Sequence, residues 1–320
     1  MSSTPSTLIT GGRGFIGVNL IQSLKDSRRL NVLDSLARSS PTGWVESATN
    51  FYNADIVNPR VLAPAFQGVS EVVHLAAYGS VMESITDPRT NFSINVEGTF
   101  NVLQAAISAG VRRIIFASTG GALIGDAAPP VSEMALPKPI SPYGASKLCG
   151  EAYCHAFAKA NGIETVCLRF GNVYGPHSAH KNGAVTLFIK ALMTSEPIVI
   201  HGDGSASRDY IHVDDLCVGI KAALDAPLLA AEVFHLSSGR ETTVLELANI
   251  LRNVAGKPTH PIEFRPARRG EVARNFANFS KAKKTFGFEP KWKIEDGLAS
   301  TWEWFIQQGD SVLGIDTTDS

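Results

Sequence analysis

The sequence has 320 residues, little cysteine and almost no net charge. Its four cysteines are Cys149, Cys154, Cys167 and Cys217, and no two of them form a C-x-x-C pair. This pattern argues against a zinc ribbon and against a disulfide scaffold. With 29 basic and 30 acidic residues, the formal net charge of −1 gives no overall attraction for nucleic acid or for an anionic membrane surface. An anionic ligand must therefore find its positive charge at a local site.

Long hydrophobic runs are also missing. No stretch approaches the roughly 18 apolar residues that a membrane-spanning helix needs, and Met1–Thr7 lacks the basic and apolar regions of a secretory signal. We therefore expect a soluble, cytoplasmic protein with reduced thiols. The hydrophobic fraction of 44% can fill a sizeable core, and the length favours two domains.

Short aliphatic segments alternate with amphipathic ones through the first half of the chain. Strands are expected at Thr7–Thr10, Leu30–Asp34, Glu71–Leu75, Arg113–Ala117 and Glu164–Phe170. Helices are expected at Phe15–Lys25, Pro59–Phe66, Asn91–Ala109 and Tyr143–Asn161. This alternation predicts an α/β fold with a Rossmann-like, doubly wound parallel sheet. Glycine and proline interrupt shorter elements after Asn172, which indicates a second, smaller and irregular α/β domain.

A glycine-rich turn follows the first expected strand. Gly11, Gly14 and Gly17 form the pattern G-x-x-G-x-x-G between that strand and a helix. Glycine permits a tight turn and the close approach of a pyrophosphate, whose charge is met by free N–H groups at the helix N-terminus. The strand, turn and helix together predict a dinucleotide site rather than an ordinary turn with an acidic cap.

Two acidic residues, Asp34 and Asp55, follow the glycine-rich turn along the chain. Asp34 ends the second strand, where a carboxylate can accept hydrogen bonds from the adenosine ribose hydroxyls. The same carboxylate would repel the 2′-phosphate of NADP, so NAD is favoured, whereas Arg38 could accommodate a phosphate. Asp55 either meets the adenine amino group or caps the helical region that begins at Pro59.

A tyrosine and a lysine share one helix face. Tyr143 and Lys147 are four residues apart, so both side chains leave the same side of the expected helix. A phenol is a poor base at neutral pH, but a neighbouring ammonium and a positive nicotinamide ring favour its ionised form. Ser118 and Thr119 end the preceding strand, where parallel sheets place ligand contacts, and either hydroxyl could address the same substrate oxygen.

These residues together resemble the NAD-dependent epimerase/dehydratase family of extended short-chain dehydrogenases/reductases, in particular its UDP-hexose 4-epimerases. The resemblance covers nearly the whole chain. Beyond the motifs above, it includes His74–Ala77, Asn95–Thr99, Leu168–Pro176, His201–Gly204, Arg208–Asp215 and Arg268–Glu271.

The resemblance implies a role for each matching residue. Tyr143 would be the catalytic base, assisted by Lys147 and by Thr119 or Ser118, while Asn95 would support the catalytic helix. The residues implied to bind NAD are Gly11, Gly14, Phe15, Ile16, Gly17, Asp34, Ser35, Asp55, Ile56, Leu75, Ala76, Ala77, Asn95, Ala117, Tyr143 and Lys147. Those implied to bind the nucleotide sugar are Asn172, Val199, His201, Arg208, Arg268, Glu271 and Asn275. Guanidinium groups pair well with phosphate oxygens, so the two arginines would supply the positive charge that the whole chain lacks.

The resemblance also divides the chain into parts. We expect residues 1–171 and about 213–238 to bind NAD, residues about 172–212 and 239–312 to bind the nucleotide sugar, and residues 313–320 to form a tail. The helices Asn91–Ala109 and Tyr143–Asn161 carry more apolar positions than one core face needs. By family analogy, they would form the contact of a homodimer.

The chain departs from the family pattern in three places. The segment after Ser118 is one residue longer than usual and lacks a tyrosine, so the hydroxyl role stays open, with Thr119 favoured. Gly120 and Gly121 stand where dehydratases carry an acid and base, which makes dehydration and decarboxylation improbable. Asn275 stands where some 4-epimerases carry a bulky tyrosine, so N-acetylated hexosamines or C6-oxidised sugars could also be accepted.

The histidines have simpler interpretations. His177 and His180 lie on a loop without a nearby carboxylate cluster, so no metal site is expected. His74 and His235 end apolar strands and are expected to be hydrogen-bonded core residues.

We therefore predict an NAD-dependent UDP-sugar 4-epimerase that acts through a 4-keto sugar, with UDP-glucose and UDP-galactose as substrates. The alternatives are a nucleotide-4-keto-sugar reductase, which would consume reduced cofactor, and a non-catalytic nucleotide-sensing relative.

Overall fold

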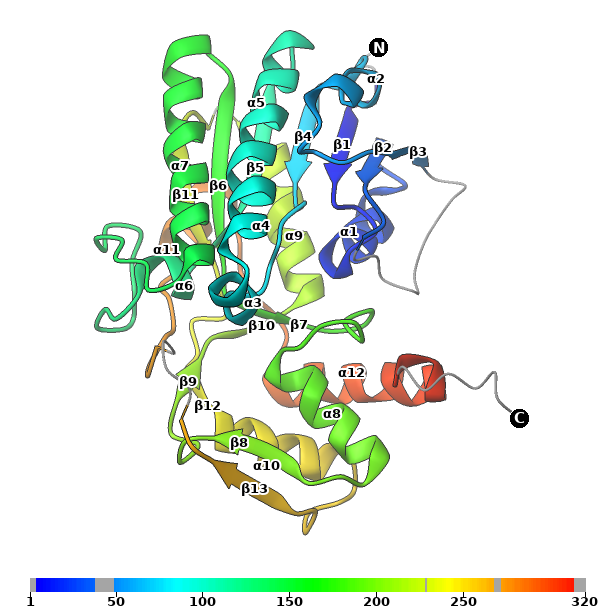
Figure 1. Cartoon of the computed structure of the whole chain (residues 1–320), viewed down its shortest axis with the longest axis vertical. Helices are drawn as coiled ribbons and strands as arrows, with labels where there is room; N and C mark the ends of the chain where they lie inside the picture. Colours follow the sequence, from blue (N-terminus) through cyan, green and yellow to red (C-terminus); the bar gives the residue numbers. More distant parts are fainter. Residues whose placement is uncertain (1–3, 38–48, 228, 268–271, 314–320) are drawn as a thin grey trace.

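A computed structural model describes residues 4–37, 49–227, 229–267 and 272–313. Seven strands form a sheet in which every neighbouring pair is parallel, in the order β11-β6-β5-β4-β1-β2-β3. Their bounds in that order are Glu232–Leu236, Glu164–Phe170, Arg113–Thr119, Glu71–His74, Ser6–Thr10, Arg29–Asp34 and Thr49–Asn53. The strand order reverses between β1 and β4, so the predicted doubly wound α/β sheet is confirmed (Figure 1).

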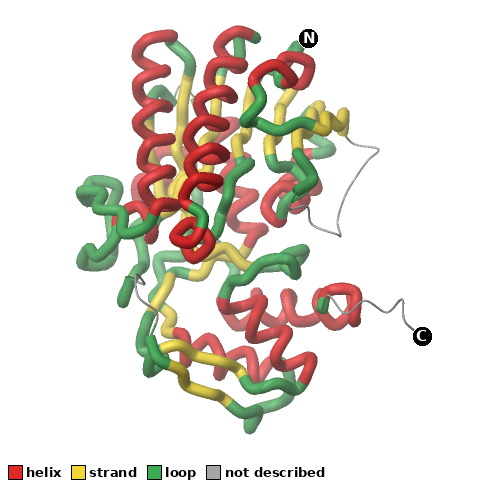
Figure 2. The backbone as a smooth tube through the Cα atoms, in the orientation of Figure 1, coloured by secondary structure: helices red, strands yellow, loops and turns green. Residues whose placement is uncertain are grey.

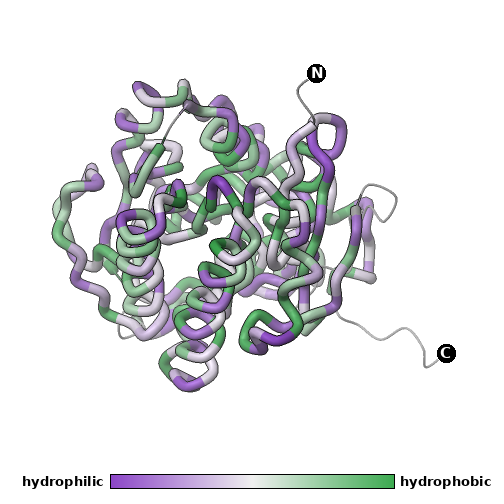
Figure 3. Tube along the Cα trace, turned by 90° about the horizontal axis from the view of Figure 1, so that it is seen from above, coloured by the Kyte–Doolittle hydropathy of each residue, from purple (hydrophilic) through white to green (hydrophobic). Residues whose placement is uncertain are grey.

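Helices cover both faces of this sheet. On one face lie α2 (Ala63–Phe66), α5 (Gly98–Ser108) and α7 (Pro142–Asn161), which share a buried hydrophobic cluster with the strands. On the other face lie α1 (Phe15–Leu24), α9 (Val213–Asp225) and α11 (Ser280–Phe286), which enclose a second cluster. In the view from above, the helices alternate between hydrophilic and hydrophobic residues along their turns (Figure 3). This alternation lets each helix bury one face and hydrate the other.

The expected helix at Asn91–Ala109 differs from the prediction. It begins earlier, as α4 (Pro88–Phe92), then passes through a π-helical segment, η3 (Ser93–Glu97), before α5. In this wider turn Asn95 is only 1% exposed, and its side chain binds the backbone of Tyr78 through both its oxygen and its nitrogen. Hydrophobic periodicity cannot reveal such a turn, because the buried polar contact that accompanies it comes from another segment of the chain.

A smaller part of the molecule faces the carboxyl ends of the sheet strands (Figure 1). Its core lies among α8 (Ala184–Thr194), α10 (Val244–Val254), α12 (Ile294–Gln308) and the parallel pair β8 (Ile198–His201) and β13 (Ile262–Arg265). Two short strand pairs join it to the sheet: β7 (Asn172–Tyr174) with β10 (Tyr210–His212), and β9 (Ser207–Arg208) with β12 (Thr242–Thr243) (Figure 2). The domain boundaries given above stay a prediction, and the tail beyond Leu313 lies outside the described residues.

A buried arginine stabilises the end of the sheet at which the strands begin. Arg113, at the start of β5, is fully buried and forms an ion pair with Glu164 of β6. Its guanidinium group also donates to four carbonyl oxygens at the end of α9, at distances of 2.8–3.0 Å. This arginine therefore neutralises a partly buried carboxylate and caps the carboxyl end of the helix.

Two general properties complete the description. All four cysteines are free thiols, and three of them are buried. Among the described helices, none combines the length and the apolar character needed to cross a membrane.

Candidate functional site

The strand order of the sheet reverses between β4 and β1, and open α/β sheets form a crevice at such a point. Ligands of open α/β sheets bind at this point, outside the carboxyl ends of the strands. Here the turn after β1 meets the segment after β4, because Leu75 N donates to Thr10 O at 3.0 Å. The predicted cofactor residues Leu75, Ala76 and Ala77 are thereby placed against the glycine-rich turn.

The glycine-rich turn has no room for side chains. Gly11 has a φ of +69°, and a Cβ atom there would lie 2.6 Å from the backbone nitrogen of Ala76. A Cβ atom on Gly17 would lie 2.6 Å from the carbonyl oxygen of Gly11. Helix α1 follows at Phe15 with Gly14 as its N-cap, and no side chain caps it. A compact turn with open backbone N–H groups at a helix N-terminus fits a pyrophosphate.

Asp34 lies at the end of β2, beside this turn. Its carboxylate accepts hydrogen bonds from the backbone N–H of Arg13 at 3.0 Å and of Leu36 at 2.8 Å. Ser35 follows it and is exposed. Arg38, which could have admitted a phosphate, lies outside the described residues.

Asp55 is exposed, and its side chain caps a local turn. Its carboxylate accepts from the backbone N–H of Val57 at 2.9 Å, whereas Asn58 caps the short helix η2 (Pro59–Val61). Ile56, by contrast, is buried against Gly98 of α5. Asp55 thus caps the turn before η2, and the expected alternative, a cap on the helical region at Pro59, is wrong because Asn58 holds that position.

Helix α7 presents the tyrosine and lysine as one group. It begins at Pro142, and the side chain of its N-cap, Ser141, accepts from Gly144 N at 3.2 Å. Lys147 Nζ lies 5.9 Å from the centre of the Tyr143 ring and donates to the carbonyl oxygen of Ala117, at the end of β5, at 2.8 Å. This hydrogen bond ties the lysine to the carboxyl edge of the sheet.

Burial opposes the charged form of both side chains. It raises the pKa of Tyr143 to about 12 and lowers the pKa of Lys147 to about 8. At neutral pH the phenol is therefore protonated, and the lysine still carries its charge. A further positive charge near the ring would be needed to bring the phenol into the working range of a base.

Asn95 links α7 to the segment that follows β4. Its side-chain nitrogen donates to Ser146 Oγ on α7 at 3.0 Å, and its oxygen accepts from Tyr78 N at 2.7 Å. Ser84, on α3 (Val81–Thr86), adds a second link, because its hydroxyl accepts from Tyr143 N at 3.2 Å. Sequence reasoning named Asn95 but not Ser84, whose role depends on a contact between distant segments.

The two candidate hydroxyls lie on opposite faces of β5. Ser118 is buried and donates to Glu151 of α7 at 2.6 Å. Thr119 is partly exposed. Because neighbouring side chains of a strand point to opposite sides, only one of them can face the substrate.

Glu151 and Arg169 are the polar residues of this region that the sequence reasoning did not select. Arg169 of β6 donates to both carboxylate oxygens of Glu151, at 2.9 and 2.7 Å. Both side chains are almost completely buried. The spacing of Glu151, four residues beyond Lys147 on the same helix, is the signal that could have revealed it.

The predicted sugar-nucleotide residues lie on the smaller part of the molecule. Asn172 is exposed at the start of β7, and Arg208 is partly exposed on β9. Val199 and His201 lie on β8, where the His201 ring contacts the Pro266 carbonyl at 3.2 Å. Arg268 and Glu271 lie outside the described residues.

Asn275 lies between the smaller part of the molecule and the end of the sheet. It is 7% exposed, and a Cβ atom on Gly121 would lie 3.4 Å from its side-chain amide. The two sequence departures, the glycine pair and this asparagine, are therefore direct neighbours.

The histidines only partly follow the prediction. His74 bonds Thr10 and Thr99 through its two ring nitrogens, and burial lowers its pKa to about 3. His235 is also buried, but neither ring nitrogen has a hydrogen-bond partner within the described part of the chain, so the expectation for it is wrong. The described residues contain no group of three side chains that could hold a metal ion.

Comparison with known proteins adds independent information. Residues 7–236 match the model of the NAD dependent epimerase/dehydratase family. A UDP-glucose 4-epimerase of Mycolicibacterium smegmatis is 35% identical over 309 residues, which cover 93% of this chain and 98% of that protein.

Solved structures are similar over the same extent. UDP-glucose 4-epimerase of Thermotoga maritima, solved with UDP-glucose, gives a TM-score of 0.90 at 34% identity and covers 95% of this chain and 99% of its own. UDP-glucose 4-epimerase of Thermus thermophilus, solved with NAD, gives a TM-score of 0.87 at 30% identity. The match covers 94% of this chain and 99% of that one.

Proposed function

Because the chain belongs to the NAD dependent epimerase/dehydratase family, we propose that it is an NAD-dependent UDP-sugar 4-epimerase. The observation that carries this proposal is the placement of Tyr143 and Lys147 on one face of α7, with Lys147 hydrogen-bonded to the carboxyl-terminal part of β5. The match of relatives over nearly the full length supports it, because both parts of the molecule are included.

The crevice fits NAD. Close packing at Gly11 and Gly17 and the uncapped start of α1 suit the pyrophosphate. The Asp34 carboxylate, which already accepts two backbone N–H groups, would accept the adenosine ribose hydroxyls and repel a 2′-phosphate. The segments Leu75–Ala77, Ser35–Leu36 and Ala117–Thr119 would form the walls around the rest of the cofactor.

The chain's own residues would then handle the proton. Tyr143 accepts the proton of the sugar C4 hydroxyl, and Thr119 hydrogen-bonds the same oxygen. Lys147, protonated below a pKa of about 8, favours the phenolate of Tyr143 and would also hold the nicotinamide ribose. NAD, when bound, would supply a positively charged nicotinamide ring and reversible hydride chemistry at the sugar C4, by which epimerisation through a 4-keto sugar is possible. The substrate-side residues Asn172 and Arg208 would bind the diphosphate during this exchange.

Dehydratase chemistry is not favoured. Gly120 and Gly121 follow Thr119 and have no side chain that could donate or accept a proton. Elimination of water across C5 and C6 needs a general acid and a general base at this position. The hydride is therefore expected to return to C4, which is the outcome of epimerisation.

The proposed activity can be tested on the purified protein. Incubation with UDP-glucose or UDP-galactose, with no cofactor or with NAD alone, is expected to interconvert the two sugars. NADP should not replace NAD, because of Asp34. A strict requirement for NADPH and a keto sugar would instead establish a reductase, and absence of turnover with intact NAD binding would establish a non-catalytic relative.

Substrate scope provides a prediction of its own. Asn275→Tyr is expected to reduce turnover of UDP-N-acetylglucosamine by about 10-fold or more relative to UDP-glucose, because a larger side chain beside Gly121 would take up room that the N-acetyl group needs. Steady-state kinetics with both substrates measures the ratio, and Asn278→Tyr, on an exposed neighbour, is the control. Equal ratios in all three proteins would contradict the idea that Asn275 sets the size of the pocket.

We also propose a homodimer formed by the outer face of α5 and α7. Phe100, Tyr153 and Phe157 form an edge-to-face aromatic cluster across these helices, with ring centres 5.5–6.2 Å apart. Phe92 and Tyr153 remain 46% and 37% exposed, which favours a second copy of this chain as the occupant of the face. Sedimentation analysis should find a dimer, and Phe92→Glu with Tyr153→Lys should give monomers.

A reducing compartment, the cytoplasm, is proposed as the site of action. The three buried cysteines carry free thiols in a chain with no disulfide among them. Cell fractionation should recover the protein with cytoplasmic enzymes, and recovery with secreted proteins would contradict this.

A further inference from the structure

Two side-chain contacts join α7 to the end of β5 behind the tyrosine and lysine. Lys147 Nζ donates to Ala117 O at 2.8 Å, and Ser118 Oγ donates to Glu151 Oε1 at 2.6 Å. Ser118 directly precedes Thr119 in the chain. The peptide that leads to Thr119 is therefore fixed to the helix that carries Tyr143.

Glu151 is itself held in one orientation. Arg169 approaches its carboxylate with two parallel hydrogen bonds, Nε to Oε1 and Nη2 to Oε2. The side chains of Glu151 and Arg169 are only 7% and 5% exposed. A bidentate pair of this kind is geometrically specific, so the carboxylate cannot rotate away from Ser118 without losing the guanidinium.

Few charges surround this carboxylate at neutral pH. The groups that face it are Lys147 and Cys154 on α7, Ser118 on β5, Arg169 and Cys167 on β6, and His235 on β11. Burial lowers the pKa of His235 to about 4, while the contact with Cys154 and burial raise that of Cys167, so both are neutral. Glu133 contributes its carbonyl oxygen to Arg169 and its carboxylate to the backbone N–H of His235. The charges that act on one another in this region are therefore those of Lys147, Glu151 and Arg169.

We propose that Glu151 is a positioning residue for the epimerisation, which holds Thr119 in register with Tyr143 through Ser118 and stabilises the charged form of Lys147. The proposal rests on the roles given to Tyr143, Lys147 and Thr119 above. Burial lowers the pKa of Lys147 to about 8, and the carboxylate of Glu151 opposes that effect. The charge of Arg169 offsets that of Glu151, so the removal of either side chain should change the pKa of Lys147.

The two members of the pair should have opposite effects on the pH dependence. Glu151→Gln removes the negative charge and leaves Arg169 unbalanced, so Lys147 should lose its proton at lower pH. The alkaline limb of kcat/KM should shift down by about one unit, which is about a 10-fold loss on that limb. Arg169→Gln leaves Glu151 unbalanced and should shift the limb upward. If Glu151→Gln does not fold, Arg169→Gln alone decides, because an unmoved limb would overturn the proposal.

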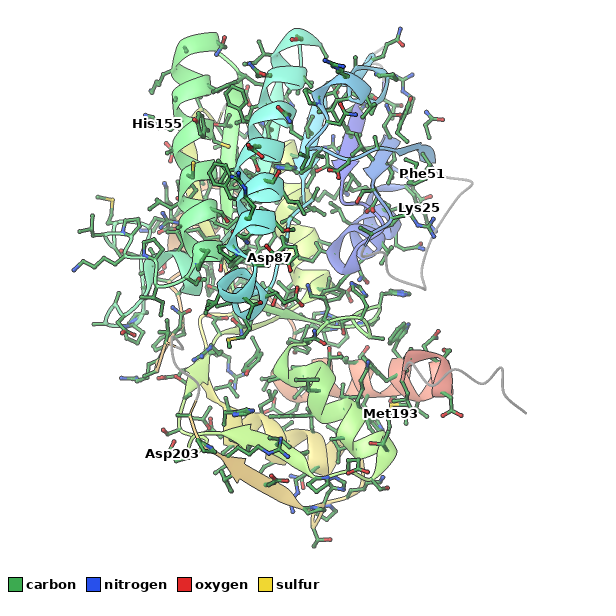
Figure 4. The ribbon with its side chains drawn as sticks, in the orientation of Figure 1. Lys25, Phe51, Asp87, His155, Met193 and Asp203 are labelled. Atoms are coloured by element: carbon green, nitrogen blue, oxygen red, sulfur yellow. The ribbon has the colours of Figure 1, made fainter. Side chains whose placement is uncertain are left out.

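Ser118→Ala separates the mechanical role from the electrostatic one. It removes the link to Glu151 but keeps both charges, so kcat should fall about 10-fold while the alkaline limb stays in place. His155→Gln is the control, because His155 lies on the same helix and is exposed on its outer side (Figure 4). Loss of activity at every pH with no shift of the limb in either Glu151→Gln or Arg169→Gln would show a purely structural role.

A readout that needs no turnover distinguishes this proposal from the proposed function. In protein labelled with ¹³C-lysine, the Cε resonance of Lys147 can be assigned with Lys147→Met and followed through a pH titration. Its midpoint should move down in Glu151→Gln and up in Arg169→Gln. Such shifts without any epimerase activity would refute the proposed function and leave the electrostatic role intact, whereas identical midpoints in an active enzyme would do the reverse.

Discussion

Replacement of Tyr143 by phenylalanine is expected to lower the rate of UDP-sugar interconversion by at least about 100-fold, the low end for loss of a general base. The substitution removes one oxygen and keeps the ring, so the packing of α7 against β5 should persist. Because Asp34, the glycine-rich turn and Arg208 are untouched, binding of NAD and of the UDP-sugar should remain. Steady-state assays measure the rate, and calorimetry measures the affinities for NAD and for the UDP-sugar.

Tyr153→Phe is the matched control for this prediction. Tyr153 lies on the same helix but is 37% exposed on its outer side, where it packs against Phe100. Loss of its hydroxyl should leave the rate unchanged. A near-normal rate in Tyr143→Phe would remove this tyrosine from the mechanism, while an equal loss in both variants would point to the helix rather than to the phenol.

Replacement of Arg113 by methionine is expected to reduce the free energy of unfolding by about 3–5 kcal/mol, the cost of breaking a buried ion pair by removing one partner. The change leaves Glu164 with only the half-exposed Arg112 as an ion-pair partner, and leaves four carbonyl oxygens at the end of α9 without their donor. Urea denaturation followed by circular dichroism should show a lower midpoint.

An exposed pair provides the comparison. Arg265 and Glu263 also form an ion pair, but both side chains are about half exposed. Arg265→Met should leave the urea midpoint unchanged, because water already solvates both groups. An unchanged midpoint in Arg113→Met would mean that the buried guanidinium contributes no net stability.

Activity should also depend on pH through Lys147. Burial lowers the pKa of this lysine to about 8, so the ammonium that favours the phenolate is present below that pH and lost above it. The pH at which activity declines on the alkaline side is therefore a property of the buried region around α7. The same reasoning explains why Glu151 and Arg169, which do not line the crevice face of β5, are expected to influence the rate.

Local patterns along the chain were sufficient for the main features of the fold. Strands such as Glu164–Phe170 and the helix over Tyr143–Asn161 are marked by hydrophobic periodicity, which reflects burial within a few turns of the chain. The glycine pattern was equally informative, because the close approach of Gly11 to Ala76 admits no side chain. The π-helical turn at Asn95 was not predictable, since Asn95 is held in place by Tyr78 of the β4–α3 connection.

The sequence by itself determined the α/β sheet, the glycine-rich turn with Asp34, and the spacing of Tyr143 and Lys147. Each of these is set by short-range constraints: side-chain volume, backbone freedom and the pitch of a helix. Only the tertiary structure decided that Ser118 turns toward Glu151, and that Arg169 completes a buried pair with Glu151 on the helix that carries Lys147. These features depend on which face of β5 meets α7 and on the packing of β6 beside it, because hydrogen bonding and burial of charge act between atoms that are close in space and distant in the chain.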